Sequence, residues 1–270
     1  MTFGLFFVVT SATTFLAPAA ASDFWDEVRH PGLRAWRQDI AQARLALRAH
    51  RFREAMAAAN AAVARLPEQA EGYVVRALAA AQLGAPEDAC RDLRRALELD
   101  PASLDDPLDA GRAAQILAGR GDFEAAARVL RRALARMREG HSRRALYTLY
   151  GDVLSALGPA HNADAIRAYR EALRTAQRDP RASLGLALAL YREDAQGTEW
   201  RALARSVAAR GRLEILLGGL ALSEADRQAR RAVLAEAIGD EAAARAAWGA
   251  AQSGPWAAHA AARAEERSPR

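Results

Sequence analysis

Histidine and cysteine are the residue types in this chain that most readily bind a metal ion or act as a nucleophile. The sequence contains five histidines and one cysteine, at His30, His50, His141, His161, His259 and Cys90. No two histidines lie within four residues of each other, so none forms the spacing that places two metal ligands on one helix face. No histidine lies near the cysteine in sequence to act as its base, and a lone cysteine forms no internal disulfide. We therefore predict no metal site and a buried, inert thiol.

Lysine is absent, and all 38 basic residues are arginine. A phosphate-binding loop that ends in Gly-Lys, a kinase-type lysine and a lysine Schiff base all need the missing amine. The sequence also lacks a Gly-x-Ser-x-Gly elbow and a Gly-x-Gly-x-x-Gly loop. The adjacent carboxylates Asp105 and Asp106 lie between Pro101 and Pro107, a composition typical of a connection rather than of a catalytic cleft. We therefore predict no enzyme activity, no catalytic residue and no cofactor.

Clusters of arginine raise the question of nucleic-acid binding. One run could form a basic ridge, and it comprises Arg128, Arg131, Arg132, Arg136, Arg138, Arg143 and Arg144. However, the comparable cluster at Arg91, Arg94 and Arg95 is interspersed with Asp88, Asp92 and Glu98, which is typical of a solvated, self-paired helix surface. No aromatic residues interleave with the basic run to stack on bases. The sequence therefore disfavours a nucleic-acid partner.

The overall composition favours helices. Alanine accounts for 70 of the 270 residues, and aromatic residues for only 6%. Alanine, leucine, arginine and glutamate are strong helix formers, whereas strand formers are too sparse for a sandwich or a wound sheet. The sequence therefore predicts an all-α protein with closely packed helices. Its net charge of +5 indicates only a mild attraction to anionic surfaces.

The N-terminal segment resembles a secretory signal. The first 22 residues carry no charged side chain, and an apolar run from Phe3 to Leu16 precedes a small-residue stretch that ends at Ala21. The run is shorter than the ~20 residues of a membrane span. We predict cleavage after Ala21 and export to the periplasm or envelope, with no transmembrane span in the mature form. Because the usual basic residue before the apolar run is missing, a retained anchor and an apolar first helix of a cytoplasmic protein are the alternatives.

An internal period of 34 residues runs through the first part of the chain. It relates Ala55, Ala59, Ala62, Val63 and Pro67 to Ala89, Leu93, Ala96, Leu97 and Pro101. Helix-breaking glycines recur at Gly84, Gly121, Gly158, Gly197 and Gly239, and His50 takes the equivalent place 34 residues before the first of them. Each unit therefore reads as a helix, a tight turn and a second helix.

The second unit shows the helix signals most clearly. Residues 71–83 form the first predicted helix, and Gly84 supplies the left-handed residue that ends it. Pro86 and the acids after it open the next helix where the helix dipole favours negative charge, and Pro101 ends it. In the third unit, Ala126, Leu130, Ala133 and Leu134 form an apolar stripe at helical spacing.

These features resemble the tetratricopeptide repeat (TPR) family. The matching positions are Tyr147, Tyr150-Gly151, Leu154, Ala165, Tyr169 and Ala172 in one unit, and Ala77, Gly84, Ala89, Leu93, Ala96 and Pro101 in another. The resemblance implies a right-handed α-solenoid of stacked antiparallel helix pairs with a concave groove. We divide the chain into a signal peptide (1–21), a lead-in (22–35), five to six helix pairs (36–255) and a capping helix with a tail (256–270). Residues 211–222 fit no phase of the repeat.

Small residues are expected where the two helices of a pair cross. Helix axes about 8 to 10 Å apart leave room only for alanine or glycine at the crossing. The repeat register places Ala55, Ala89, Ala126 and Ala165 at these crossings.

The resemblance also implies the function of a noncatalytic scaffold that binds a partner protein or an extended peptide. In such arrays the first helix of each pair lines the concave face, which points to Arg37, Arg44, Arg48, Gln82, Gln115, Thr148 and Asp152 as partner-binding residues. The three arginines would form a positive rim suited to an acidic segment or a terminal carboxylate. The alternatives are a structural, self-assembling role for the Ala-rich C-terminal end and a cytoplasmic regulatory module; the oligomeric state stays open.

Overall fold

The computed structural model describes residues 31–137, 141–174, 179–211, 216–217 and 222–266. The predicted signal peptide and most of the predicted lead-in lie outside these residues. Six antiparallel helix pairs follow one another in the described part: α2 (Leu33–Arg48) with α3 (Phe52–Arg65), α4 (Ala70–Gln82) with α5 (Pro86–Leu99), α6 (Pro107–Gly119) with α7 (Phe123–Arg136), α8 (His141–Leu157) with α9 (Asn162–Arg174), α10 (Pro180–Glu193) with α11 (Glu199–Ala208), and α13 (Glu224–Ile238) with α14 (Glu241–Ala250).

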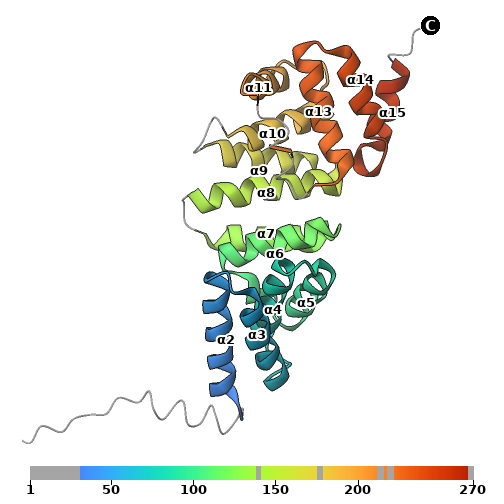
Figure 1. Ribbon diagram of the computed structural model, residues 1–270. Helices are drawn as coiled ribbons and strands as arrows, with labels where there is room; N and C mark the ends of the chain where they lie inside the picture. Colours follow the sequence, from blue (N-terminus) through green and yellow to red (C-terminus); the bar gives the residue numbers. More distant parts are fainter. Residues whose placement is uncertain (1–30, 138–140, 175–178, 212–215, 218–221, 267–270) are drawn as a thin grey trace, which may run out of the picture.

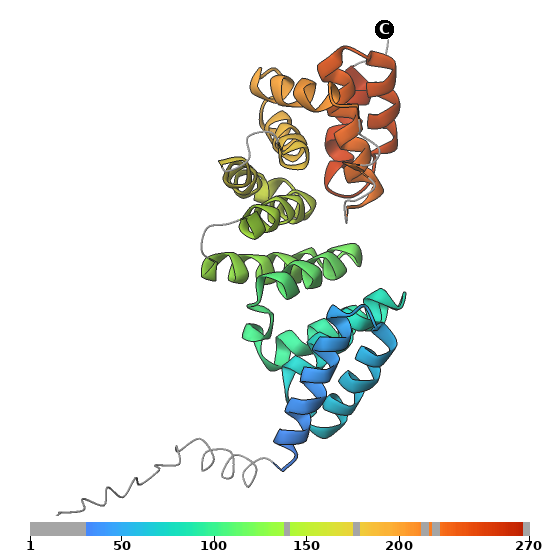
Figure 2. The ribbon, with the colours of Figure 1, turned by 60° about the vertical axis from the view of Figure 1, so that its left-hand side comes forward.

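The pairs stack into an elongated array, with α2 and α15 (Ala257–Glu266) near its opposite ends (Figures 1 and 2). Short 3₁₀ turns join some of the helices: η1 (Pro101–Leu104), η2 (Pro159–His161) and η3 (Gly254–Trp256). Each helix packs on its partner, and each first helix also packs on the first helix of the next pair. The predicted fold class, an all-α solenoid of stacked helix pairs, is confirmed. Within the described residues, no helix has both the length and the apolar character that crossing a membrane requires.

The turns within the pairs explain why the repeat is marked by glycine. The backbone φ is 80° at Gly84, 77° at Gly121, 111° at Gly158 and 82° at Gly239, all in the region that residues with a side chain rarely adopt. His50 occupies the equivalent turn with a φ of 56°. Gly197 is not among the residues with a positive φ, but a Cβ atom there would lie 3.2 Å from the Asp194 carbonyl oxygen.

Side-chain caps and prolines define where several helices begin. The N-terminal backbone N–H groups of α6, α7, α10, α13 and α14 donate to the side chains of Asp106, Asp122, Asp179, Ser223 and Asp240, respectively. Proline occupies the first turn of α5, α6 and α10, where its missing N–H has no partner to lose. The start of α5 at Pro86 is where the sequence predicts it.

The alanines predicted at the helix crossings are fully buried. Ala55, Ala89, Ala126 and Ala165 each expose 0% of their surface, as expected for residues at the crossings. The Ala126, Leu130, Ala133 and Leu134 stripe of α7 is buried as well. Of the stretch 211–222, the structure describes Gly211, 216–217 and Leu222, and the side chains of Leu217 and Leu222 belong to the core of the C-terminal helices.

A tyrosine fills the space left by two glycines in the C-terminal half of the array. The ring of Tyr169 on α9 lies against Gly151 on α8 and Gly185 on α10. A Cβ atom at Gly151 would lie 2.6 Å from the Tyr169 ring, and one at Gly185 would lie 2.3 Å from it. Both positions therefore require glycine because the buried ring takes up the volume of a side chain.

Candidate functional site

The first helices of successive pairs border two adjoining cavities, which we call the open groove. One cavity, of about 270 Å³, is lined by Leu47, His50, Phe52, Leu78, Ala81, Gln82, Arg112, Gln115 and Ile116. The other, of about 300 Å³, is lined by Pro107, Leu108, Gly111, Arg112, Gln115, Ala145, Leu146, Leu149 and Arg181. Arg112 and Gln115 of α6 border both cavities, so the two form one continuous surface across α2, α4, α6, α8 and α10.

Two of the seven predicted partner-binding residues line this groove. Gln82 and Gln115 are exposed and border the first cavity from α4 and α6. Arg37 and Arg48 are exposed on α2 but are not part of the cavity lining. The remaining three, Arg44, Thr148 and Asp152, have contacts within the chain that take up their polar groups.

Arg44 bridges three first helices instead of standing free as part of a positive rim. Its Nε donates to Glu71 on α4 and its Nη1 to Asp109 on α6, both at 2.8 Å. Burial alone would lower the pKa of Arg44, but the hydrogen bonds and negative charges of Asp109 and Glu71 raise it overall. The sequence places Arg44 on the expected face, but its charge is already matched by two carboxylates.

Thr148 and Asp152 lie on α8 beneath other parts of the chain. Thr148 exposes 3% of its surface, and its hydroxyl donates to the Arg144 carbonyl. Asp152 exposes 1%. The expectation that both residues line an open groove therefore does not match the structure, because later helices cover this part of the concave face.

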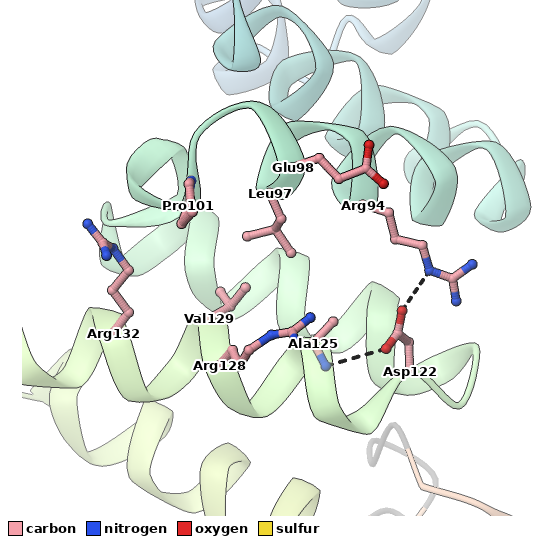
Figure 3. Close-up of a pocket in the computed structure, with 9 residues that line it drawn as sticks. All are labelled: Arg94, Leu97, Glu98, Pro101, Asp122, Ala125, Arg128, Val129 and Arg132. Carbon is pink, nitrogen blue, oxygen red and sulfur yellow. Dashed lines mark hydrogen bonds and ion pairs between the residues drawn. The ribbon is translucent and has the colours of Figure 1, made fainter.

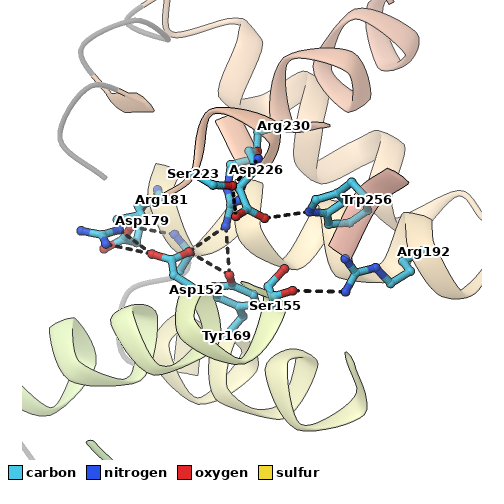
Figure 4. A network of polar contacts seen from close by, with 11 residues as sticks. Asp152, Ser155, Tyr169, Asp179, Arg181, Arg192, Ser223, Asp226, Arg230 and Trp256 are labelled. Atoms are coloured by element: carbon cyan, nitrogen blue, oxygen red, sulfur yellow. Dashed lines mark hydrogen bonds and ion pairs between the residues drawn. The ribbon is translucent and has the colours of Figure 1, made fainter. Parts of the chain in front are cut away.

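Asp152 is the centre of a buried polar network that joins α8, α9, α10 and α13 (Figure 4). Its Oδ1 accepts from the Tyr169 hydroxyl at 2.8 Å and from Arg230 Nη2 at 2.9 Å. Its Oδ2 accepts from Arg181 Nε at 2.9 Å. Burial, followed by the charge of Asp152, raises the pKa of Tyr169 well above its ordinary value, so the phenol stays protonated as a donor.

The same network continues to the C-terminal 3₁₀ turn η3. Asp226 on α13 accepts from Trp256 Nε1 at 2.7 Å, and the guanidinium carbon of Arg192 lies 3.6 Å from the centre of the Trp256 ring. Burial lowers the pKa of Arg192 to about 10. These contacts seat η3 and α13 over α8 and close the concave face at the C-terminal end.

Arg112 is the residue of the groove that the sequence reasoning missed. It is exposed, borders both cavities, and makes no hydrogen bond or ion pair with any other described residue. Leu108, one turn before it on α6, is 62% exposed and lines the second cavity. Arg112 precedes Gln115 by three residues and so shares its helix face, which is a sequence signal that could have identified it.

The arginines at 91, 94 and 95 on α5 are each paired with a carboxylate, as the sequence predicts for a self-paired surface. These three bind Asp88, Asp122 and Glu98, respectively. On α7, Arg132 and Arg136 both bind Asp105. Arg138 lies outside the described residues. This pairing reduces the charge that a basic ridge could offer to nucleic acid.

Cys90 is buried on α5, as predicted, with 4% of its surface exposed. Burial raises the pKa of its thiol, so the thiolate that a nucleophile needs is disfavoured. Among the described residues, no three His, Cys, Asp or Glu side chains gather in a way that could hold a metal ion.

No protein-family model and no curated protein matches the sequence. Among solved structures, MamA is 19% identical over 70% of this chain and 97% of its own, with a TM-score of 0.50. PilF of Pseudomonas aeruginosa is 19% identical over 81% of this chain and 91% of its own, with a TM-score of 0.49. YrrB, described as a TPR protein with an unusual peptide-binding site, is 18% identical over 77% of this chain and 97% of its own, with a TM-score of 0.46. The stacked helix pairs and the likeness to MamA show a TPR-type fold.

Proposed function

We propose that this tetratricopeptide-repeat chain is a noncatalytic scaffold whose open groove binds an acidic segment of a partner protein. The observation that carries the proposal is the position of Arg112. It is a cation without a partner among the described residues, in the middle of a groove whose walls are mostly apolar. A solvent-exposed arginine beside apolar walls is suited to a carboxylate that arrives together with apolar side chains.

The groove offers both kinds of contact that such a segment needs. Leu108, Leu146 and Leu149 supply apolar surface in the second cavity. Gln82 and Gln115 supply amide groups that can donate to and accept from an extended backbone in the first. Because the two cavities adjoin at Arg112, a segment that spans both would place a carboxylate near the middle of its length.

The N-terminal sequence supports a location for this scaffold. An uncharged apolar run followed by small residues up to Ala21 favours export and cleavage. We therefore propose that the mature chain acts in the periplasm or in a cell-envelope assembly. N-terminal sequencing of the native protein tests this location, because the mature form should begin at Ser22.

Peptide selection on the full chain tests the groove. Random peptides displayed on phage are selected against the wild type and then measured against Arg112→Glu. We expect the selected peptides to be rich in acidic and apolar residues, and Arg112→Glu to weaken their binding by about tenfold, since it replaces a charge-assisted hydrogen bond with repulsion. Arg53→Glu is the matched control, because Arg53 is exposed on α3 and lines neither cavity. Equal binding to both variants, or selection of basic peptides, would disprove the groove assignment.

A further inference from the structure

A second pocket lies between the second helices of two neighbouring pairs, away from the open groove. It has a volume of about 520 Å³ and is lined by Arg94, Leu97, Glu98, Pro101, Asp122, Ala125, Arg128, Val129 and Arg132 (Figure 3). None of these residues lines the open groove. The pocket is formed by α5, α7 and the start of η1, and we call it the convex pocket.

The convex pocket follows from a local lengthening of the repeat. The turn glycines Gly84 and Gly121 are 37 residues apart, whereas the period from His50 to Gly84 is 34. The added residues form the 3₁₀ turn η1, which packs against α4, α5, α6 and α7. Leu97 on α5 and Val129 on α7 then face each other across the pocket instead of meeting in a closed helix contact (Figure 3).

The shape of the convex pocket fits a chain segment. Its lining on α7 runs from Asp122 to Arg132, which is about 15 Å of helix at 1.5 Å per residue. A strand-like peptide of about four or five residues covers that length. Leu97 and Pro101 provide an apolar surface along it, and Val129, which is 2% exposed, also lines the pocket.

The charged side chains around the convex pocket include more positive than negative charge that is not paired. Both carboxylates in its lining have a cation partner: Asp122 binds Arg94 at 2.7 Å, and Glu98 binds Arg95 at 3.1 Å. Arg132 shares the single carboxylate of Asp105 with Arg136. Arg128 has no hydrogen-bond or ion-pair partner among the described residues. The pocket therefore presents a cation beside apolar surface, and an anionic occupant would complement it.

We propose that the convex pocket is a second docking site, which binds an acidic segment of a partner protein by pairing a carboxylate with Arg128 and placing an apolar side chain on Leu97 and Val129. The site uses a different face of the solenoid from the open groove, so one chain can hold two acidic segments at once. This proposal does not depend on the function assigned to the open groove.

The test uses a defined probe on the full chain. A fluorescent peptide of alternating glutamate and leucine is titrated into the Arg112→Glu variant, in which binding at the open groove is weakened. We expect saturable binding and slower hydrogen exchange in the segments 94–101 and 122–132. A further Arg128→Glu change should weaken binding by about tenfold, the effect of one charge-assisted hydrogen bond. Arg131→Glu is the matched control, since Arg131 is exposed on the same helix but does not line the pocket.

Two further probes separate the proposal from its alternatives. A peptide of alternating glutamate and serine should bind several-fold more weakly, because it lacks the apolar contact with Leu97 and Val129. Equal affinity of the two peptides, or equal losses in Arg128→Glu and Arg131→Glu, would show diffuse charge attraction and overturn the proposal. Vesicles containing anionic lipid serve as the last probe: binding to vesicles without binding to the glutamate–leucine peptide would assign the surface to a membrane and overturn it as well.

Discussion

The two ends of the solenoid are built from the same helix pairs but have different interiors. Between α4 and α8 the core consists mainly of alanine and leucine, with valine at a few positions. Between α10 and α15 it is built around an aromatic cluster of Tyr191, Trp200, Trp248 and Trp256. The Tyr191 and Trp200 rings pack edge to face, with their centroids 4.8 Å apart. The core of the C-terminal end therefore contains much larger side chains than the core between α4 and α8.

The ion pairs that span the concave face also differ between the two ends, because the pair at the C-terminal end is more deeply buried. At the N-terminal end, Arg44 connects α2 to α6 with 30% of its side chain exposed. At the C-terminal end, Arg230 connects α13 to α8 with 1% of its side chain exposed. An ion pair near water contributes little net stability, whereas a fully buried charge depends on its partner. The comparison distinguishes an end of the concave face that has open cavities from an end that is held together by a buried ion pair.

Among the substitutions that test this comparison, replacement of Asp152 should lower the free energy of unfolding the most. Asp152→Asn removes the charge that pairs with Arg230 and Arg181, and an uncompensated buried cation costs about 3 to 5 kcal/mol. Asp109→Asn removes one partner of Arg44 at the other end, but Glu71 and water remain, so we expect a loss of about 1 kcal/mol. Urea unfolding followed by circular dichroism measures both. Equal losses in the two variants would refute the distinction between a structural and a ligand-accessible end.

The glycines around Tyr169 provide the next test. Gly185→Ala places a methyl group 2.3 Å from the Tyr169 ring, which is held by its bond to Asp152, so we expect a loss of about 1 to 3 kcal/mol. Gly72→Ala at the N-terminal end places its methyl group 3.0 Å from a single methyl group of Val63, which can shift. We therefore expect a smaller loss for Gly72→Ala. The melting temperatures of the two variants check this order, and a reversed order would contradict it.

The alkaline response should also distinguish the two ends. Because the chain lacks lysine, tyrosine is the main side chain that ionises near pH 10 in the unfolded state. Burial raises the pKa of Tyr169 and of Tyr191 in the folded state, so the folded chain keeps protons that the unfolded chain releases. Stability from these two groups is complete below about pH 10 and is lost as the pH rises above it. Burial lowers the pKa of Arg192 to about 10, so the contribution of this one group to stability rises with pH, opposite to that of the tyrosines.

Tyr169→Phe tests this pH dependence. Removing one of the two retained protons should reduce the slope of unfolding free energy against pH by up to about 1.4 kcal/mol per pH unit between about pH 10 and 11.5. Tryptophan fluorescence during urea unfolding suits the measurement, since three of the five tryptophans, Trp200, Trp248 and Trp256, lie at the C-terminal end. Parallel pH profiles for wild type and variant would show that Tyr169 does not hold its proton.

The sequence predicted those features that depend on nearby residues. The turn at Gly84, the helix start at Pro86 and the burial of Ala89 follow from local backbone and packing rules, and all three are confirmed. The state of Asp152 depends instead on Arg230, 78 residues away and beyond the stretch 211–222, whose sequence fits no phase of the repeat. The same limit applies to Arg44, whose position on the concave face was predicted but whose two carboxylate partners were not.

The smallest expected effect concerns the turn between the two helices of a pair. The first pair has histidine at this turn, whereas the last pair has glycine. His50 has a φ of 56° in the position that Gly239 occupies with a φ of 82° at the C-terminal end. A left-handed residue with a side chain costs roughly 1 kcal/mol, so His50→Gly should raise stability by up to that amount, less the edge contact between His50 and Phe52. Gly239→Ala should lower stability by a similar amount for the same reason. Thermal unfolding of both variants measures these opposite shifts.

Because His50 also lines the open groove, a stabilised His50→Gly variant that binds its selected peptides more weakly would show that this turn keeps histidine for the ligand at the cost of backbone strain.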